Sequence, residues 1–492
     1  MSLPVYSSHT GPLSLFQSAV HEVLSQQPAQ QNSTHAGIGV TAQAPEMQAV
    51  SAVAKHFDKT GNFDVAPAAA TAGAAAPAAP LSVRSQCAQL AAQIALYSVT
   101  DPAKAEILRQ EFQAGTCDPL WAQCLAVYDQ YRLSQKAQPY INYQSIDDFV
   151  IEMCFPDNAT IAVIGDWGTG MNAALILLQQ IGDNFQPDVL LHLGDIYYSG
   201  LPSECKSHFT DLIDKVWPDG GPRKKPLVYT LDGNHDRYAG SNGGYYDLLK
   251  NLNQSAGKPQ PNSYFVIRNN FWQLVALDTG YYDADPSATR AGTALTRLVD
   301  QEVPWHLDKI NNPGANVDKN ANPGGTRGTV LVSHHQLYSF TGVGKNSAGA
   351  PMAVNPYLAN VFTLVFDKIN LWLWGHEHAL CIFEPYSYGG HAMPKGRCVG
   401  ASAVPMYLAQ RPVPDPKLIP SPGESGAPQI VPGTGLGDNG TVFNYCYAIM
   451  NLAGPKLSVD YYQLNSTDAA PGNPPPLGKP LYSETITAGT RD

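Results

Sequence analysis

Charged residues are scarce in this 492-residue chain, and long hydrophobic runs are missing from it. Asp, Glu, Lys and Arg make up 14% of the sequence, well below the usual quarter. The net charge is −11 and the basic residues do not cluster, so we expect no nucleic acid as a partner. No stretch approaches the roughly 18 consecutive apolar residues of a transmembrane helix, and we therefore expect no membrane span.

Cysteine is also rare, with eight residues in the whole chain, and this number does not indicate a disulfide scaffold. Cys117 and Cys124 are close enough in sequence to pair, but we expect them to be reduced. Residues 1–30 lack the basic start and the apolar core of a secretory signal. Together these features predict a cytoplasmic location, and export by another route stays open as the alternative.

The composition that remains is that of a globular protein, and it changes along the chain. Residues 1–63 are polar apart from one amphipathic stretch, and residues 64–81 are almost wholly Ala and Pro, which predicts a linker. In residues 82–157 apolar side chains recur at helical spacings, so we expect a mainly helical region. This N-terminal part could dock an unknown partner or cover an active site, and residues 158–492 are expected to form the catalytic domain.

Short apolar runs bounded by turn residues begin near residue 158 and predict buried strands. The first two enclose a helical pattern over Ala173–Ile181, which is the arrangement of a βαβ unit. The runs are Ile161–Ile164, Val189–Leu193, Leu227–Leu231, Phe271–Leu277, Val330–Val332 and Leu371–Trp374. The pattern predicts an α/β architecture whose functional residues lie along one edge of a sheet. His192 falls inside such a run and is expected to belong to the core.

Polar clusters follow five of these runs. They are Asp166-Trp167-Gly168, Gly194-Asp195-Ile196-Tyr197-Tyr198, Gly233-Asn234-His235-Asp236, Ser333-His334-His335 and Gly375-His376-Glu377-His378. Any one of them is weak, because a strand-end Asp often caps a turn and a single His is often structural. Taken together they collect the oxygen and nitrogen donors that metal ions use, and their glycines permit sharp turns close to a site.

This ordered set of motifs resembles the calcineurin-like metallophosphoesterase superfamily and, within it, the purple acid phosphatases. The resemblance covers roughly residues 158–464 and implies a four-layer α/β/β/α sandwich. Most of the superfamily has a metal-binding His two residues after the first Asp, but Gly168 stands there in this chain. Tyr198 follows Asp195 by three positions, where purple acid phosphatases place a metal-bound tyrosinate.

The resemblance implies two metal sites that share one carboxylate. The expected ligands are Asp166, Tyr198 and His378 for the first metal, Asn234, His334 and His376 for the second, and Asp195 as the bridge. Gln336 replaces a proline of the family's motif, so His335 stays open as the alternative to His334. Asn234, His235 and His335 are expected to contact the substrate.

Tyrosinate coordination bears on the identity of the first metal. A free Tyr has a pKa near 10, so holding it as phenolate at neutral pH costs about 4 kcal/mol. A trivalent ion offsets this cost more readily than a divalent one, which favours Fe(III) in the first site. The second site would hold Fe(II), Zn(II) or Mn(II). The alternative is that Tyr198 is a packing residue beside Zn or Mn.

The implied activity is hydrolysis of a small phosphomonoester by a metal-bound hydroxide, with His235 as the general acid. Asp236 would either orient His235 or cap its loop. A phosphodiesterase acting on nucleotide or lipid-headgroup diesters is the alternative enzyme. An inactive scaffold is the alternative of another class, but such proteins lose ligands, and all seven candidates are present here.

Overall fold

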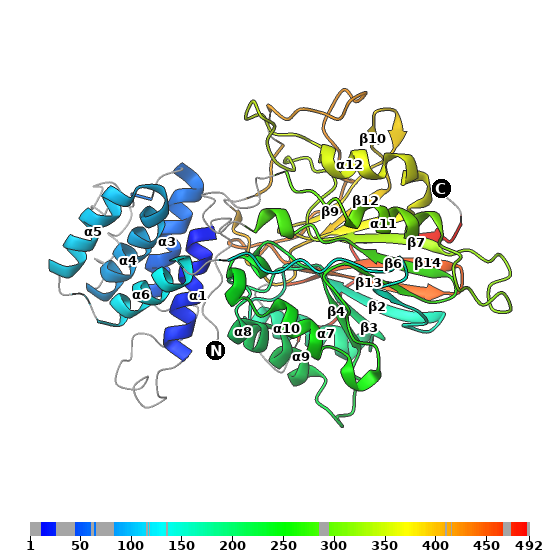
Figure 1. The fold of residues 1–492 in the computed structure, drawn as a ribbon, viewed down its shortest axis with the longest axis horizontal. Coiled ribbons are helices and arrows are strands. Elements are labelled where there is room, and N and C mark those ends of the chain that lie inside the picture. Colours follow the sequence, from blue (N-terminus) through cyan, green and yellow to red (C-terminus); the bar gives the residue numbers. More distant parts are fainter. Residues whose placement is uncertain are drawn as a thin grey trace.

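A bundle of helices at the N-terminal end lies beside a larger body built on two β-sheets (Figure 1). The computed structural model describes residues 11–25, 45–60, 63–64, 83–114, 117, 119–133, 136–284, 295–408, 411–414, 416–465 and 474–489. The expected linker, residues 64–81, lies outside these ranges apart from Asp64. Within the described ranges, no helix has both the length and the apolar character needed to cross a bilayer.

The described part of the bundle contains five helices. They are α1 (Gly11–Ser25), α3 (Pro45–Thr60), α4 (Val83–Thr100), α5 (Pro102–Ala114) and α6 (Pro119–Leu133). Residues 11–20 of α1 are all buried, and the larger apolar side chains Leu13, Phe16, Val20 and Val23 recur every three or four positions and share one face of the helix. This face packs in one hydrophobic core with α3, α4 and α6. Residues 1–63 therefore contribute two packed helices, which their polar composition did not indicate.

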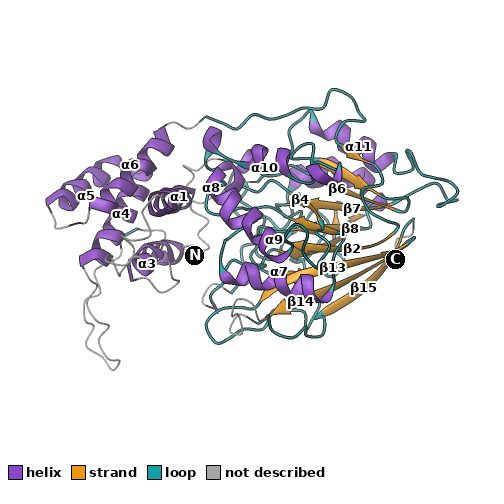
Figure 2. Ribbon diagram, turned by 90° about the horizontal axis from the view of Figure 1, so that it is seen from below, coloured by secondary structure: helices purple, strands orange, loops and turns teal. Residues whose placement is uncertain are grey.

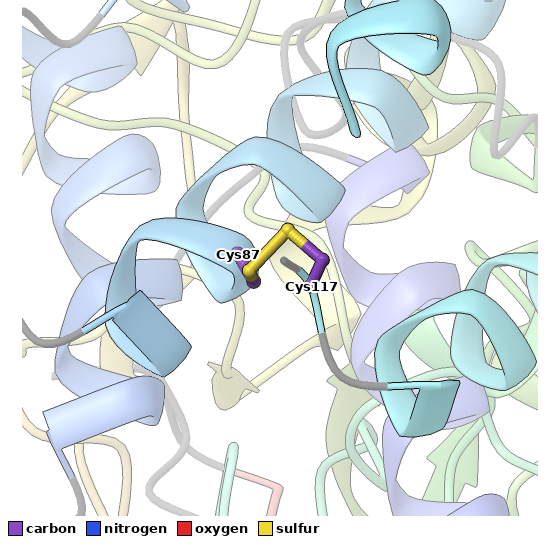
Figure 3. Close-up of a disulfide and its surroundings, with 2 residues drawn as sticks. All are labelled: Cys87 and Cys117. Carbon is purple, nitrogen blue, oxygen red and sulfur yellow. A yellow bond between two sulfur atoms is a disulfide. The ribbon is translucent and has the colours of Figure 1, made fainter. Parts of the chain in front are cut away.

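A disulfide joins helix α4 to the segment that precedes α6 (Figure 3). Cys87 on α4 pairs with Cys117, just before α6, with their Cα atoms 5.5 Å apart. The expectation that Cys117 is reduced is therefore wrong, whereas Cys124 is reduced as expected. Proximity in sequence gave no sign of this pair, because packing of the helices brings the two cysteines together across 30 residues.

Two sheets form the body of the larger part. The six-stranded sheet has the order β15–β14–β13–β2–β3–β4, and the seven-stranded sheet has the order β1–β5–β6–β7–β8–β12–β9. The strands of the first are β2 (Asn158–Ile164), β3 (Val189–His192), β4 (Leu227–Thr230), β13 (Tyr445–Ala453), β14 (Lys456–Leu464) and β15 (Tyr482–Thr487). Those of the second are β1 (Val150–Ile151), β5 (Phe265–Arg268), β6 (Trp272–Ala276), β7 (Gly328–Ser333), β8 (Leu371–Trp374), β9 (Leu380–Ile382) and β12 (Lys395–Val399). A separate hairpin pairs β10 (Ser387–Tyr388) with β11 (His391–Ala392).

The two sheets pack face to face, with helices on both outer faces. In β2, Ile161 and Val163 lie in the core between the sheets, whereas Ala162 and Ile164 face the helices, as the alternation of a strand requires. Helices α7 (Asn172–Asn184), α8 (Pro202–Glu204), α9 (Asp211–Val216) and α10 (Tyr245–Asn251) lie on the side of the six-stranded sheet. Helices α11 (Glu302–Asn311) and α12 (Pro356–Phe362) lie on the opposite side (Figure 1). In Figure 2, seen from below, α7 and α9 lie in front of the strands. The predicted α/β/β/α sandwich, preceded by a helical region, is confirmed.

Parallel pairing sets the position of the polar clusters. Strands β2, β3 and β4 run parallel to one another in one sheet, and β7 and β8 run parallel in the other. Each of these strands is followed at its carboxyl end by one of the five clusters. Because the carboxyl ends of parallel strands meet at one edge of a sheet, the fold gathers residues from two sheets in one place.

Candidate metal centre

Left-handed backbone turns bring three of the expected ligands inward. Asp166, Asp195 and His376 have backbone φ angles of +53°, +73° and +64°, which residues other than Gly rarely adopt. Such strain is typical of functional sites. Gly233 allows the turn after β4 to approach the turn at Asp195, since a Cβ atom at position 233 would lie 2.1 Å from the Oδ1 atom of Asp195.

Three donor atoms from three strand ends form one compact group. The Oδ1 atom of Asn234 lies 3.0 Å from Nε2 of His334 and 3.1 Å from Nδ1 of His376. The two histidine nitrogens are themselves 3.2 Å apart. All three residues are buried. They are the ligands expected for the second metal, and the structure brings them together.

A second compact group lies on the other side of Asp195. The hydroxyl of Tyr197 is 3.1 Å from Oδ1 of Asp166 and 3.0 Å from Nε2 of His378. The same Oδ1 and Nε2 atoms are 3.3 Å apart. This group contains two of the three ligands expected for the first metal, together with a tyrosine that was not expected there.

Asp195 lies between the two groups and faces both. Its Oδ1 atom is 3.4 Å from Nε2 of His334, and its Oδ2 atom is 3.3 Å from the Tyr197 hydroxyl. One carboxylate oxygen is thus directed to each group, which is the arrangement of a bridging ligand.

The spacing of these atoms fits metal coordination. Two donors that bind one ion at about 2.1 Å lie about 3.0 Å apart at a right angle and about 3.4 Å apart at the tetrahedral angle. The distances within both groups fall between 3.0 and 3.3 Å. Carboxylate, amide, phenol and imidazole groups are also the donors that iron, zinc and manganese accept in proteins. The residues therefore fit two metal ions.

Tyr197 takes the place that the sequence spacing assigned to Tyr198. The Tyr198 ring packs near His208, with centroids 6.0 Å apart, and its backbone carbonyl accepts a hydrogen bond from Nδ1 of His235. Burial and the carboxylate of Glu204 raise the pKa of its phenol. The Tyr197 hydroxyl, and not that of Tyr198, lies near Asp166, Asp195 and His378, so Tyr197 becomes the candidate tyrosine ligand. No signal in the sequence separates two adjacent tyrosines, because the course of the loop decides which one points inward.

Hydrogen bonding and burial prepare the histidines as ligands. Nδ1 of His334 lies 2.9 Å from the carbonyl of Leu193 and donates to it, which leaves the Nε2 lone pair facing Asn234. Burial lowers the pKa of His334 to about 3 and that of His378 to about 4. Both imidazoles are consequently neutral at physiological pH, the form that binds metals.

The carboxyl groups show the opposite effect of burial. Burial raises the pKa of Asp166, and it raises the pKa of Asp195 to about 6. Burial, followed by these two carboxylates, raises the pKa of the Tyr197 phenol well above its usual range. Nearby cations would reverse all three effects, because they stabilise the charged forms.

His235 lies at the edge of the centre with a fixed orientation. Its Nδ1 atom donates to the Tyr198 carbonyl at 2.7 Å, and its Nε2 atom is 3.9 Å from Oδ2 of Asp195. Asp236 accepts hydrogen bonds from the backbone amides of Asp195, Ile196 and Gly233. Asp236 thus caps the loop, and the Tyr198 carbonyl rather than Asp236 orients His235.

His335 points to polar residues that follow the seven-stranded sheet. Its Nδ1 and Nε2 atoms are each 3.1 Å from a partner, the Thr279 hydroxyl and Oδ2 of Asp283. Its ring lies against that of His376, with centroids 4.3 Å apart. His334 therefore belongs to the donor group, and His335 lies beside it. Sequence reasoning missed Thr279, although Asp278-Thr279-Gly280 follows the apolar run of β6 just as the other clusters follow theirs.

Comparison with known proteins agrees with this geometry. The family model described as calcineurin-like phosphoesterase matches residues 159–380, the range that contains every donor named above. The match covers less than half of the chain and supports the predicted superfamily for this segment. The purple acid phosphatase subtype stays a prediction. No curated protein matches the chain.

Three solved structures have a distant similarity to this chain. GAP50, titled the anchor in the inner membrane complex of Plasmodium, is 12% identical, with 68% of this chain and 90% of that chain covered and a TM-score of 0.40. The purple acid phosphatase PPD1 from yellow lupin is 15% identical, with 68% and 55% covered and a TM-score of 0.38. PhoD is 12% identical, with 73% of each chain covered and a TM-score of 0.40. At these scores the likenesses carry no argument about activity.

Proposed function

We propose that this protein is a dinuclear metal-dependent phosphoesterase that hydrolyses small phosphomonoesters. The family match supports metal-dependent hydrolysis of a phosphoester. The observation that carries the two-metal proposal is the position of Asp195, whose two carboxylate oxygens face two separate groups of donors. With a single metal ion, one of these two groups of buried donors would bind no ion.

The first ion would be held by Asp166, Tyr197 and His378, and the second by Asn234, His334 and His376, with Asp195 shared. When bound, such a pair of ions lowers the pKa of a water nucleophile and offsets the negative charge that develops on the phosphoryl oxygens. Tyr197 favours Fe(III) in the first position, because burial and two carboxylates oppose its ionisation and a trivalent ion compensates most strongly. Fe(II), Zn(II) or Mn(II) would occupy the second.

His235 is proposed as the general acid. Because its Nδ1 atom donates to the Tyr198 carbonyl, a proton for the leaving group is carried at Nε2, on the side of Asp195. An imidazole suits this task because its pKa lies close to the working pH. Asn234 and His335, which lie against His334 and His376, are proposed to contact the substrate.

Elemental analysis and two substrates test this proposal. We expect about two metal ions per chain, a visible band from tyrosinate bound to Fe(III), and faster turnover of a phosphomonoester than of a bis-ester. Fewer than one metal ion per chain would contradict a metalloenzyme. Faster turnover of the bis-ester would favour the phosphodiesterase alternative, which the same ligands would serve.

A leaving-group comparison tests the role of His235. We expect His235→Asn to lower kcat for an alkyl phosphate by about 10²–10⁴-fold, since the alkoxide leaves only with a proton. For p-nitrophenyl phosphate, whose leaving group is stable as an anion, the loss should be much smaller. Equal losses for the two substrates would show that His235 does not act as the acid.

A further inference from the structure

The loop that carries Asp195 and Tyr197 is held by side chains rather than by regular structure. Between β3 and α8 the chain forms turns, and its backbone is fixed from several directions. Glu204, at the end of this segment, is fully buried. Its Oε2 atom accepts hydrogen bonds from the backbone amides of Ser199 and Leu201, each at 3.0 Å. The carboxylate therefore closes the loop directly after the two tyrosines.

The third hydrogen bond to this carboxylate comes from a distant part of the chain. Oγ of Ser18, on helix α1 of the N-terminal bundle, donates to Oε1 of Glu204 at 2.8 Å across 186 residues. A buried carboxylate is costly unless hydrogen bonds replace its hydration. Loss of the Ser18 hydroxyl would leave Oε1 buried without this donor and would weaken the hold of Glu204 on the loop.

Two further contacts join α1 to residues that directly follow this loop. Oγ of Ser203 donates to Oε2 of Glu22 at 3.1 Å, and the ring of His21 lies 4.9 Å from that of His208. His208 in turn donates from Nδ1 to the backbone carbonyl of Tyr197 at 2.5 Å.

Hydrophobic contacts also join α1 to this loop. Tyr197 and Tyr198 belong to the core of the N-terminal bundle, together with Phe16 and Val20 of α1. In Figure 1, α1 is the bundle helix next to the sandwich, on the side of α8. One tyrosine thus has its ring in the core of the bundle and its hydroxyl among Asp166, Asp195 and His378.

We propose that helix α1 is a positioning element of the metal centre, and that Ser18, through Glu204, holds the loop in the conformation that directs the Tyr197 hydroxyl at the metal ligands. Ser18 and Glu204 are positioning residues in this scheme. The N-terminal bundle is accordingly part of the construction of the active site and not a separate docking module. The link between α1 and the loop does not depend on the proposed function. Its consequence, faster loss of metal when the link is broken, rests on that function.

Hydrogen exchange in the full-length chain tests the link without metal or substrate. In Ser18→Ala, the amides of Ser199 and Leu201 should exchange at least about tenfold faster, because a hydrogen bond to a buried carboxylate is lost. Ser14→Ala is the matched control, since Ser14 is another buried serine on α1 and no hydrogen bond among the described residues joins it to Glu204. Equal exchange of residues 195–204 in the two variants would overturn the proposal.

Metal release to a chelator tests the consequence. Ser18→Ala should lose metal at least about fivefold faster than Ser14→Ala at matched thermal stability, and its kcat should fall with little change in KM. Glu204→Gln provides a second variant, and adding Ser18→Ala to it should cause little further change. Faster exchange with unchanged metal release would overturn the positioning role. A wild-type chain without metal would refute the proposed function, and exchange would still decide whether α1 holds the loop.

Discussion

At the scale of single residues, the two adjacent tyrosines Tyr197 and Tyr198 have different surroundings. Both side chains are almost fully buried. The Tyr197 hydroxyl lies within 3.3 Å of two aspartates and a histidine. Burial and the Glu204 carboxylate raise the pKa of the Tyr198 phenol. Metal ions would stabilise the ionised form of the first phenol only. The two residues therefore form a natural pair of test and control.

We expect Tyr197→Phe to lower metal affinity by at least about tenfold, because it removes a ligand but keeps the ring in the core. If the first ion is Fe(III), the visible absorption band should vanish in Tyr197→Phe and persist in Tyr198→Phe. Metal titration and absorption spectra of both variants measure this. A band lost in Tyr198→Phe and kept in Tyr197→Phe would return the ligand to the position that the motif spacing indicated.

His192 predicts a dependence of stability on pH. It is fully buried in β3, and burial lowers its pKa to about 3. In the unfolded chain a His takes up its proton near pH 6.5, so between these values the unfolded state binds one more proton than the folded state. The free energy of unfolding should therefore fall, as pH falls below 6.5, by about 1.4 kcal/mol per pH unit from this residue.

The variant His192→Phe should remove that slope, since a ring of similar size fits beside Trp167 and Phe209 and carries no titrating group. Urea unfolding at pH 7.5, 6.0 and 5.0 measures the difference between the two proteins. Above pH 7 the difference should be constant, because His192 is neutral in both states. A difference that does not change between pH 7.5 and 5.0 would show that His192 is accessible to protons in the folded protein.

At the scale of elements, buried strands could be predicted from the sequence and the packing of helices could not. Strands β2, β3, β4, β7 and β8 are covered on both faces, so each is an apolar run that ends at a polar cluster. This pattern located the polar clusters, and the family resemblance then assigned the candidate ligands within them. By contrast, the burial of α1 depends on α6 and on a loop about 180 residues away, which no local pattern records. The inward direction of Tyr197 depends on the same contact.

The disulfide is a second feature of packing that spacing did not show. Cys87–Cys117 closes a loop of 30 residues around α4 and α5, and restricting the unfolded chain in this way stabilises a fold by about 3–4 kcal/mol. We expect Cys87→Ala/Cys117→Ala to lower the free energy of unfolding of the bundle by this amount. Thermal unfolding with and without a thiol reductant measures it. The reductant should destabilise the wild-type chain and leave the double variant unchanged, and a wild-type chain indifferent to reductant would show that the bond contributes nothing.

At the scale of the whole molecule, the proposed metal ions would bind residues from several parts of the fold. Asp166, Asp195 and Asn234 follow strands of the six-stranded sheet, whereas His334 and His376 follow strands of the seven-stranded sheet. The N-terminal bundle reaches the same centre through the rings of Tyr197 and Tyr198. Ligands from both sheets and a tyrosine packed in the bundle thus meet at one point.

Removal of metal should accordingly lower the stability of both parts of the molecule. At free metal about a thousandfold above the dissociation constant, binding adds about 4 kcal/mol to the folded state, so a chelator should lower Tm by several degrees. Because the bundle core includes the two tyrosines, exchange of α4 amides should speed up together with exchange of β2 amides. Hydrogen exchange with and without chelator measures both segments in one experiment. Faster exchange confined to β2 would mean that the bundle and the sandwich open independently, and the contact of α1 with the loop would then be too weak to couple them.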